Sequence, residues 1–362
     1  MNTNVLRVVK ACTAADVPVL LWGGPGIGKT TAIEQMAAEE GAPCEVVIGS
    51  IHEPSDFVGL PVVRPEGGVA MEAPQWALNL AAAGKGYLVL DELSNSAPAV
   101  QAGLLRVALN KVVGNVTLPQ GVKVIAAANE AANAADFYEL SPPLANRFCH
   151  LHVKADPAEW TVGITMGFHS VSEAMSVDPH TPDREVASLA HIAAFITTQP
   201  DLLYVEPTDA AQSGGAWPSP RTWHMLGRVL SHLGDDDNAG RLLAAKGLVG
   251  EAAAMTFLAW SEHADLPDAE SVLENPAIFD FGKRADRSFA VLSAVVGVVA
   301  NKPTEARWSK AWKVLAACAT QAQPDVAAAA ARRLQLCRPD NAKLPPEVKA
   351  FVPVLQAAGM VA

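Results

Sequence analysis

The stretch Val17–Trp22, followed by Gly23-Gly24-Pro25-Gly26-Ile27-Gly28-Lys29-Thr30-Thr31, decides the fold of this chain. A short apolar run leads into a loop that fits the pattern G-x-x-x-x-G-K-S/T, and a helical stretch, Thr31–Glu40, follows it. Glycines allow successive backbone N–H groups to turn inward around phosphate oxygens, and the dipole of the following helix points at the same place. The sequence therefore predicts a buried strand, a phosphate-binding loop and a helix, in that order.

The loop also predicts which parts of a nucleotide its residues contact. Lys29 would reach the β- and γ-phosphate oxygens, and the Thr30 hydroxyl would ligate Mg²⁺. We therefore expect ATP and Mg²⁺ as cofactors. The candidate nucleotide-binding residues are Gly23, Gly24, Pro25, Gly26, Ile27, Gly28, Lys29, Thr30 and Thr31.

A second apolar run ends in two carboxylates, as Tyr87-Leu88-Val89-Leu90-Asp91-Glu92. We assign Asp91 to the ligand shell of Mg²⁺, with Thr30, and Glu92 to polarising the attacking water. Taken alone, the pair is equally compatible with an acidic strand end or a helix N-cap. Its position downstream of the loop favours the catalytic interpretation, and Glu92 favours hydrolysis over phosphate transfer to a small substrate.

A third apolar run, Val124–Ala128, ends at Asn129. Its amide could hydrogen-bond the γ-phosphate and orient the attacking water. An asparagine at a strand end is also a common turn former, which is the alternative here. Because Asn129 follows what would be a third strand of the same sheet, we expect it in the active site.

Two arginines are candidates for a role at a phosphate. Arg147 ends a helical stretch before the last predicted strand, and it would point out of the domain toward a neighbouring subunit's γ-phosphate. Arg221 lies in the first turn of a later helix, where a positive charge is unfavourable, and it could bend back onto the nucleotide. The alternatives are an arginine that satisfies helix C-terminal carbonyls for Arg147 and an exposed first-turn arginine for Arg221.

Short β-branched runs alternate with helical stretches over residues 1–154, which predicts an α/β fold with a central parallel sheet flanked by helices. From residue 155 onward, helical patterns replace the strands. We expect a nucleotide-binding core at 1–154, an all-helical lid at 155–262 that carries Arg221, and a helical C-terminal extension of unknown role at 263–362. The predicted strands are Val17–Trp22, Cys44–Ile48, Tyr87–Leu90, Val122–Ala127 and Cys149–Val153. A helical stretch is predicted at Ala239–His263.

Two segments interrupt the predicted core. Glu53–Pro74 is rich in proline and glycine and too long for an ordinary connection, so we expect it to be functional. Lys111–Pro119 places apolar pairs on either side of Gly114-Asn115 and predicts a β-hairpin. A passive surface loop is the alternative for both segments.

The composition limits the classes of partner. The 362 residues carry a net charge of −11 without a run of lysine and arginine, which argues against nucleic acid and anionic lipid. Five widely spaced cysteines without a C-x-x-C pair argue against a disulfide framework or zinc site and favour a reducing compartment. No apolar run reaches the roughly 20 residues that span a bilayer, and the N-terminus lacks the pattern of a secretory signal. We therefore expect a cytoplasmic protein with no membrane segment.

In their order along the chain, these motifs resemble those of the AAA+ superfamily. The phosphate loop corresponds to Walker A, Asp91-Glu92 to Walker B, Asn129 to sensor 1, Arg147 to the arginine finger and Arg221 to sensor 2. The resemblance implies a P-loop AAA+ core followed by a helical lid, with ATP bound between them. It also implies a homo-oligomeric ring, usually a hexamer, in which Arg147 of one subunit completes the site of the next.

A closer resemblance is carried by His52–Pro61 and Asp91–Gln101, which are similar to MoxR-like ATPases of the kind found near von Willebrand factor A domain proteins. The match extends over about residues 1–235, and the residues after about 263 resemble no family. It implies that Glu53–Pro74 and Lys111–Pro119 project toward the pore or one face of the ring. Phe57 is then the side chain expected to contact a substrate.

Three functions are compatible with these features. The first is a MoxR-like ATPase that hydrolyses ATP with Mg²⁺ in a ring and remodels or activates a partner protein, such as a von Willebrand factor A domain protein. The second is a nucleic-acid motor or loader, which would share every active-site element but is disfavoured by the acidic charge. The third is a nucleotide-gated switch, in which slow hydrolysis times an assembly. The sequence does not distinguish the first from the third.

Overall fold

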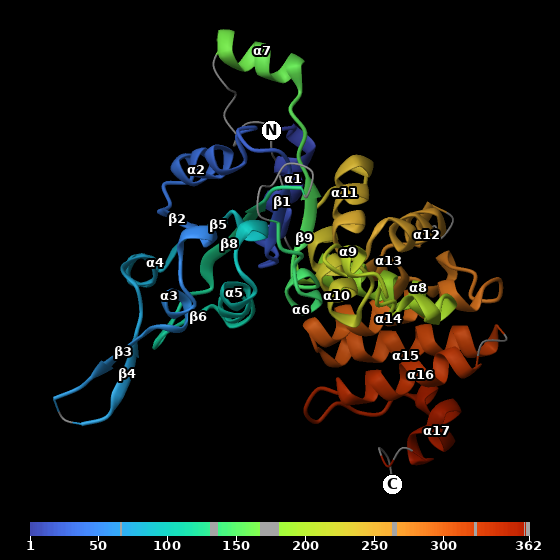
Figure 1. Ribbon diagram of the computed structural model, residues 1–362. Coiled ribbons are helices and arrows are strands. Elements are labelled where there is room, and N and C mark those ends of the chain that lie inside the picture. The colour runs from blue at the N-terminus through green and yellow to red at the C-terminus, as the bar shows by residue number, and fades with distance from the viewer. Residues whose placement is uncertain are drawn as a thin grey trace. The chain divides into compact units, whose positions relative to one another are not determined.

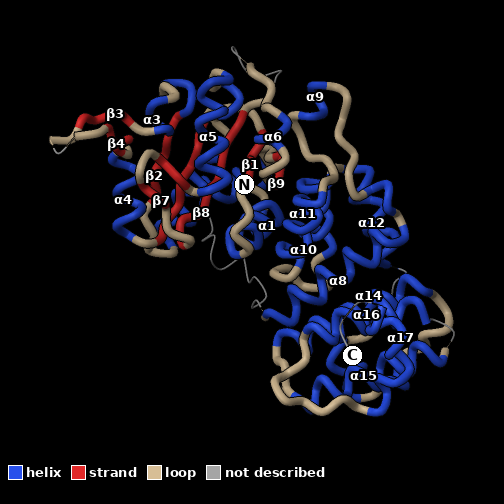
Figure 2. The backbone as a smooth tube through the Cα atoms, turned by 90° about the horizontal axis from the view of Figure 1, so that it is seen from below, coloured by secondary structure: helices blue, strands red, loops and turns tan. Residues whose placement is uncertain are grey.

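The computed structural model describes residues 1–65, 67–130, 137–166, 181–262, 266–321, 324–357 and 359. The chain separates into two compact units, one formed by Met1–Pro179 with Tyr204–Met255 and the other by His180–Leu203 with Thr256–Ala362. Among the described residues, all strands lie in the first unit (Figure 2). The division into domains at 1–154, 155–262 and 263–362 stays a prediction, and its second boundary adjoins residues 263–265, which lie outside the described residues.

Five parallel strands form the central sheet of the first unit, in the order β2-β5-β8-β1-β9. In this register Val19 of strand β1 lies opposite Ile125 of β8 and Cys149 of β9. The five predicted strands are confirmed, although β1 starts two residues late because Pro18 has no N–H to donate to a neighbouring strand. The strands are β1 (Val19–Trp22), β2 (Cys44–Ile48), β5 (Lys85–Asp91), β8 (Gly121–Ala128) and β9 (Cys149–His152).

Helices cover both faces of this sheet, so all four residues of β1 are buried, as expected for a parallel sheet (Figure 1). Leu20 and Trp22 share a hydrophobic cluster with side chains of three helices, whereas two other helices pack on the opposite face. The first three are α4 (Gln75–Ala83), α5 (Pro98–Asn110) and α6 (Pro142–Ala145), and the other two are α1 (Thr3–Ala14) and α2 (Lys29–Glu39).

Both predicted interruptions of the core form β-hairpins. The first contains the short helix α3 (Ser55–Val58) and the antiparallel strands β3 (Leu60–Val63) and β4 (Val69–Glu72), which extend away from the sheet (Figure 1). The second is the predicted hairpin, with β6 (Val112–Val113) and β7 (Val116–Thr117).

Phe57 does not contact solvent, and the expectation that it contacts a substrate is wrong for this structure. Its side chain is 0% exposed and belongs to the core cluster that includes α5. A Cβ added at Gly103 of α5 would lie 3.1 Å from the Phe57 Cβ, so helix and ring are in close contact. The hairpin strands carry the exposed apolar side chains Leu60, Val62, Val63 and Val69.

The remaining described helices of the first unit follow the sheet. The predicted helical stretch Ala239–His263 is helical over its described residues, but Gly250, with a φ of 76°, divides it into two helices. A side chain at Gly250 would also meet the Ala216 carbonyl oxygen at 2.8 Å, so the break requires glycine. These helices are α7 (Pro157–Met166), α9 (Ala210–Ser213), α10 (Pro220–Leu230), α11 (Asn238–Val249) and α12 (Glu251–Glu262), the last continuing into the second unit.

The second unit is a helical bundle around a core in which Trp308 and Trp312 are fully buried. Helix α8, which falls within the predicted lid, packs in this unit along α14. The contact is close, because a Cβ added at Gly297 of α14 would clash with Val186 of α8. No described helix has both the length and the apolar character required to cross a membrane. The helices are α8 (Pro182–Thr198), α13 (Ala269–Glu274), α14 (Ala285–Asn301), α15 (Glu305–Thr320), α16 (Pro324–Leu336) and α17 (Val352–Ala357).

Candidate functional site

The sequence-predicted residues of the core meet where three adjacent parallel strands end. The phosphate loop follows β1, Asp91 is the last residue of β5, and Asn129 follows β8. Two glycines shape the loop in different ways. Gly28 adopts a φ of 84° directly before α2, and a Cβ at Gly23 would lie 2.6 Å from the Val153 carbonyl oxygen.

Lys29 is held inside the loop by oxygen atoms. Its ammonium donates to the Gly23 and Gly24 carbonyl oxygens at 2.7 and 2.9 Å, and to Oδ1 of Asn129 at 3.2 Å. Burial lowers the pKa of Lys29, although the charges of Asp91 and Glu130 act in the opposite direction. The Lys29 ammonium and the Asn129 amide oxygen are therefore in direct contact at the ends of β1 and β8.

Thr30 and Asp91 are already paired. The Thr30 hydroxyl donates to Oδ2 of Asp91 at 2.7 Å. A hydroxyl and a carboxylate are the oxygen ligands that Mg²⁺ accepts beside phosphate and water, so this pair fits the ion. Among the described residues there is no group of three or more His, Cys, Asp or Glu side chains that could hold a metal. The two oxygen ligands of Thr30 and Asp91 fit an ion whose other positions are filled by phosphate and water.

Glu92 stands next to Asp91 in a left-handed conformation, with a φ of 56°. Its backbone N–H donates to Oδ1 of Asp91 at 2.8 Å, and its carboxylate accepts a hydrogen bond from the Ser50 hydroxyl. Sequence reasoning missed Ser50, which lies just after β2. The only signal for it was its position after a strand next to β5, and serine is a common turn residue at the end of any strand.

Arg147 and Arg221 form a second group. Arg147 donates to the Pro143 carbonyl oxygen, its Nε is buried without a partner, and burial together with the charge of Arg221 lowers its pKa. Arg221 donates to Oδ1 of Asn146 at 3.5 Å. Neither guanidinium has an ion pair in the described part of the chain, and no hydrogen bond joins either arginine to Lys29 or Asp91. Two adjacent positive charges without a carboxylate favour binding of an anion.

Asn146 links these two arginines, and sequence reasoning missed it too. It is buried, its Oδ1 accepts from the Ser219 hydroxyl at 2.8 Å, and its Nδ2 donates to the Trp217 carbonyl oxygen at 3.2 Å. Ser219 is the N-cap of α10, where it forms a capping box with Thr222. The start of α10, and Arg221 with it, is therefore anchored to the residue next to Arg147.

Trp22 stands directly before the phosphate loop and stacks on His150 and His152, with ring centroids 6.2 and 6.3 Å away. Its Nε1–H donates to Nδ1 of His150 at 2.9 Å, and Nε2 of His150 lies 2.9 Å from the Ala145 carbonyl oxygen. His150 is therefore neutral with its proton on Nε2, because Nδ1 acts as an acceptor. Burial lowers the pKa of His150 from 6.5 to about 4.

This neutral histidine predicts a loss of stability in acid. Since the pKa is about 4 in the folded state and 6.5 without burial, the unfolded chain takes up the proton first as the pH falls below 6.5. The free energy of unfolding should fall by about 2 kcal/mol from this group between pH 7 and about pH 5, measured by urea denaturation. His150→Gln should flatten the decline, whereas His152→Gln should retain it. Equal slopes in wild type and His150→Gln would contradict the assignment.

A cavity of about 620 Å³ opens beside the phosphate loop within the first unit. Trp22, Glu130 and His152 contribute to its wall, so the cavity and the loop share the end of β1. Glu130 also contacts Nδ1 of His152 at 3.3 Å, which joins the ends of β8 and β9. The other residues that line the cavity are Phe137, Glu139, Leu140, His150, Leu151, Gly214, Gly215, Ala216, Leu243, Lys246, Gly250 and Glu251.

Comparison with curated proteins finds no match. Solved structures that match include a candidate ATPase from Cytophaga hutchinsonii, which is 18% identical over 70% of this chain and 86% of its own, with a TM-score of 0.44. They also include a point mutant of RuvB from Thermotoga maritima, which is 16% identical over 74% of this chain and 73% of its own, with a TM-score of 0.29.

A protein-family comparison matches residues 18–148 to a family described as AAA domain, dynein-related subfamily. The matched segment runs from the residue before β1 to the residue before β9, and it includes the phosphate loop, Asp91, Asn129 and Arg147. Arg221 lies outside it. Over residues 18–148 the chain is therefore similar to AAA domains of the dynein-related subfamily.

Proposed function

We propose that this protein is a MoxR-like AAA+ ATPase, which hydrolyses ATP with Mg²⁺ in a ring of identical subunits and remodels or activates a partner protein. The observation that carries the proposal is the convergence of Lys29, Thr30, Asp91 and Asn129 at adjacent strand ends, joined by hydrogen bonds of 2.7 and 3.2 Å. A phosphate-binding amine, a metal-binding pair and a water-orienting amide are the groups that hydrolysis of a nucleoside triphosphate needs.

In the proposed site each residue has one role. Gly23–Thr31 binds the phosphates, with Lys29 on the β- and γ-oxygens. Thr30 and Asp91 hold Mg²⁺, which supplies charge neutralisation at the phosphates. Glu92 accepts the proton of the attacking water, and Asn129 orients that water. The Ser50 hydroxyl donates to Oε2 of Glu92, which leaves Oε1 of the same carboxylate able to accept that proton.

The arginine pair supports a site shared between subunits. Arg221 lies close enough to Arg147 that its charge lowers the pKa of Arg147. Neither arginine is hydrogen-bonded to the phosphate loop of its own chain. We therefore propose that both act on the nucleotide of the neighbouring subunit. This differs from the expectation that Arg221 bends back within its own subunit. A ring, proposed to be hexameric, would supply the pair to every site.

A protein is the partner class that we propose. The net charge of −11 disfavours a long phosphate backbone. The β3–β4 hairpin presents exposed apolar side chains, and its Arg64 is paired with Glu72. A von Willebrand factor A domain protein is the first partner to test. A cytoplasmic site of action accords with the five cysteines, none of which forms a disulfide.

The first experiment measures phosphate release from ATP by the purified chain. We expect hydrolysis that stops with EDTA and returns with Mg²⁺, because Thr30 and Asp91 form the only proposed metal-binding pair. Single- and double-stranded DNA should leave the rate unchanged. A DNA-stimulated rate that falls with salt would instead support a nucleic-acid motor. Absence of Mg²⁺-dependent hydrolysis at any protein concentration would refute the proposed function.

A further inference from the structure

Lys111 closes the base of the β6–β7 hairpin. It is the C-cap residue of α5 and has a φ of 52°. The N–H of Leu118, on the far side of the hairpin, donates to the Lys111 carbonyl oxygen at 2.7 Å. The Lys111 ammonium donates to the Gln120 carbonyl oxygen at 3.2 Å. One residue therefore holds both ends of the hairpin where it leaves the sheet.

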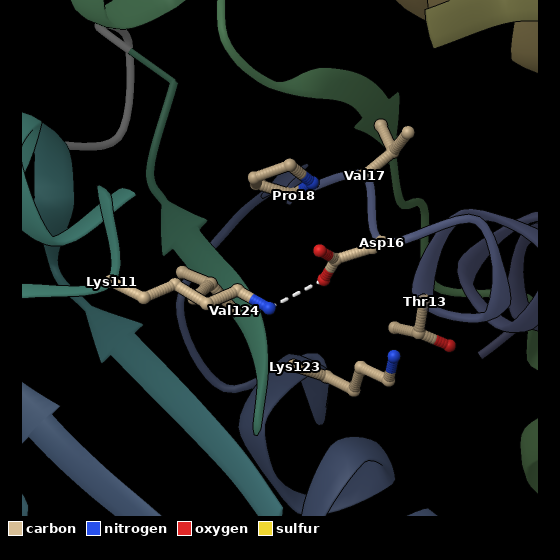
Figure 3. Close-up of a pocket in the computed structure, with 7 residues that line it drawn as sticks. All are labelled: Thr13, Asp16, Val17, Pro18, Lys111, Lys123 and Val124. Atoms are coloured by element: carbon tan, nitrogen blue, oxygen red, sulfur yellow. Dashed lines mark hydrogen bonds and ion pairs between the residues drawn. The ribbon is translucent and has the colours of Figure 1, made fainter. Parts of the chain in front are cut away.

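The same ammonium also contacts the chain that leads into the phosphate loop. It donates to Oδ1 of Asp16 at 2.5 Å, and the Lys111 side chain is only 16% exposed (Figure 3). Asp16 lies in the turn between α1 and β1, and it too is left-handed, with a φ of 54°. Non-glycine residues rarely adopt this conformation, so each end of the ion pair lies at a constrained point of the backbone.

The pair lies beside a small cavity of about 10 Å³, lined by Thr13, Asp16, Val17, Pro18, Lys111, Lys123 and Val124. Lys123 extends into the same space from β8 but forms no hydrogen bond with Asp16 (Figure 3). Burial lowers the pKa of Lys123, and the charge of Lys111 adds to that effect. Asp16 thus has two neighbouring ammonium groups and is bonded to the one that holds the hairpin.

The two hairpins of the first unit are joined to each other. A Cβ at Gly59, before β3, would lie 2.7 Å from the Gly114 Cα, and a Cβ at Gly114 would lie 2.7 Å from the Met71 carbonyl oxygen. Asn115 donates to Oε2 of Glu72 at 3.2 Å. The backbones therefore touch at the two glycines, and a displacement of one hairpin must move the other.

We propose that Lys111 is a positioning residue that fixes the paired hairpins to the start of β1, so that a load on the hairpins is transmitted to the phosphate loop. The route runs from β3–β4 through Gly59 and Gly114 to β6–β7, and from Lys111 through Asp16 to β1. Displacing the hairpins pulls on Asp16, which lies three residues before the strand that carries the loop. A partner bound to the exposed apolar hairpin would thereby alter the geometry around Lys29.

A double-mutant cycle tests this coupling. Only its measurement of kcat depends on the proposed ATPase function. Gly114→Ala forces the hairpins apart, and Asn115→Ala weakens their contact without a clash. Each is combined with Lys111→Met, which keeps the unbranched apolar part of the side chain and removes its charged end. Lys123→Met is the matched control, since it removes an equivalent charge from the same cavity. Thermal unfolding verifies that all variants are folded.

We expect Gly114→Ala to lower kcat about five-fold when Lys111 is present and less than about two-fold in the Lys111→Met background. Lys123→Met should leave the five-fold effect intact. Hydrogen exchange of residues 15–22 gives an independent readout without ATP: either hairpin variant should accelerate it only when Lys111 is present. Equal effects in both backgrounds, or no response of residues 15–22, would overturn the proposal. If the wild type does not hydrolyse ATP, the proposed function fails, and the exchange measurement alone decides the coupling.

Discussion

Glu92→Gln is expected to reduce ATP turnover by at least about 100-fold while leaving ATP binding intact, because a glutamine cannot accept the proton of the attacking water. The substitution is nearly isosteric, and the Glu92 backbone N–H can still donate to Asp91. Steady-state phosphate release gives kcat, and titration with a fluorescently labelled nucleotide gives the affinity. Asp91 and Thr30 remain in place, so binding of Mg²⁺–ATP should not weaken.

The matched control for this variant is Glu45→Gln, on the neighbouring strand β2. Glu45 accepts a hydrogen bond from Asn79 and takes no part in the proposed site, so its kcat should stay within about two-fold of wild type. A Glu92→Gln protein that turns over ATP at the wild-type rate would remove Glu92 from the mechanism. Held in the ATP state, the variant should also retain the assembled ring on its partner. Affinity capture with and without ATP would then identify that partner.

Arg147→Ala is expected to lower kcat by about 1,000-fold, the usual order of effect when an arginine finger is removed. ATP affinity of the isolated subunit should change little, because the proposed target of Arg147 lies on the neighbouring subunit. Arg106→Ala is the control, since Arg106 is an exposed arginine of α5. A dilute monomer carrying Arg147→Ala that hydrolyses ATP as fast as the wild type would contradict the shared site.

Mixing two inactive variants makes this prediction sharper. A Lys29→Ala subunit has a defective phosphate loop but an intact arginine pair, whereas an Arg147→Ala subunit has the reverse. In a mixed ring, Lys29→Ala subunits would supply arginines to the intact loops of their neighbours, so the mixture should recover activity that neither protein has alone. Failure to recover, with mixed assembly verified by native mass spectrometry, would place Arg147 in its own subunit's site or outside the mechanism.

The meeting of the candidate site residues of the core was predictable, because each of them ends or follows an apolar strand. Asp91 and Asn129 end two runs whose length and β-branched content identify buried parallel strands, and the phosphate loop ends a third. Parallel strands bring their carboxyl ends to one edge of a sheet, so residues distant in sequence meet there without further information. The 2.7 Å contact of Thr30 with Asp91 follows from this topology.

Other features depended on packing partners that no local pattern identifies. Phe57 was expected to contact a substrate, but Gly103 leaves a space on α5 that the Phe57 side chain fills. The predicted helix 239–263 has strong helical residues on both sides of Gly250, and the close approach of Ala216 decides the break. In each case the deciding residue is far away in the sequence.

The phosphate loop, the strands and the carboxylates were determined by the sequence alone, because local chain geometry and the period of apolar residues specify them. Tertiary structure decided which arginine lies with which group. The buried Asn146 accepts hydrogen bonds from both Ser219 and Arg221, so it anchors α10 beside Arg147 and not beside Lys29. The tertiary structure also decided that Lys111 pairs with Asp16. These two left-handed residues are 95 positions apart and come together only when α1 and α5 pack against the sheet that contains β8.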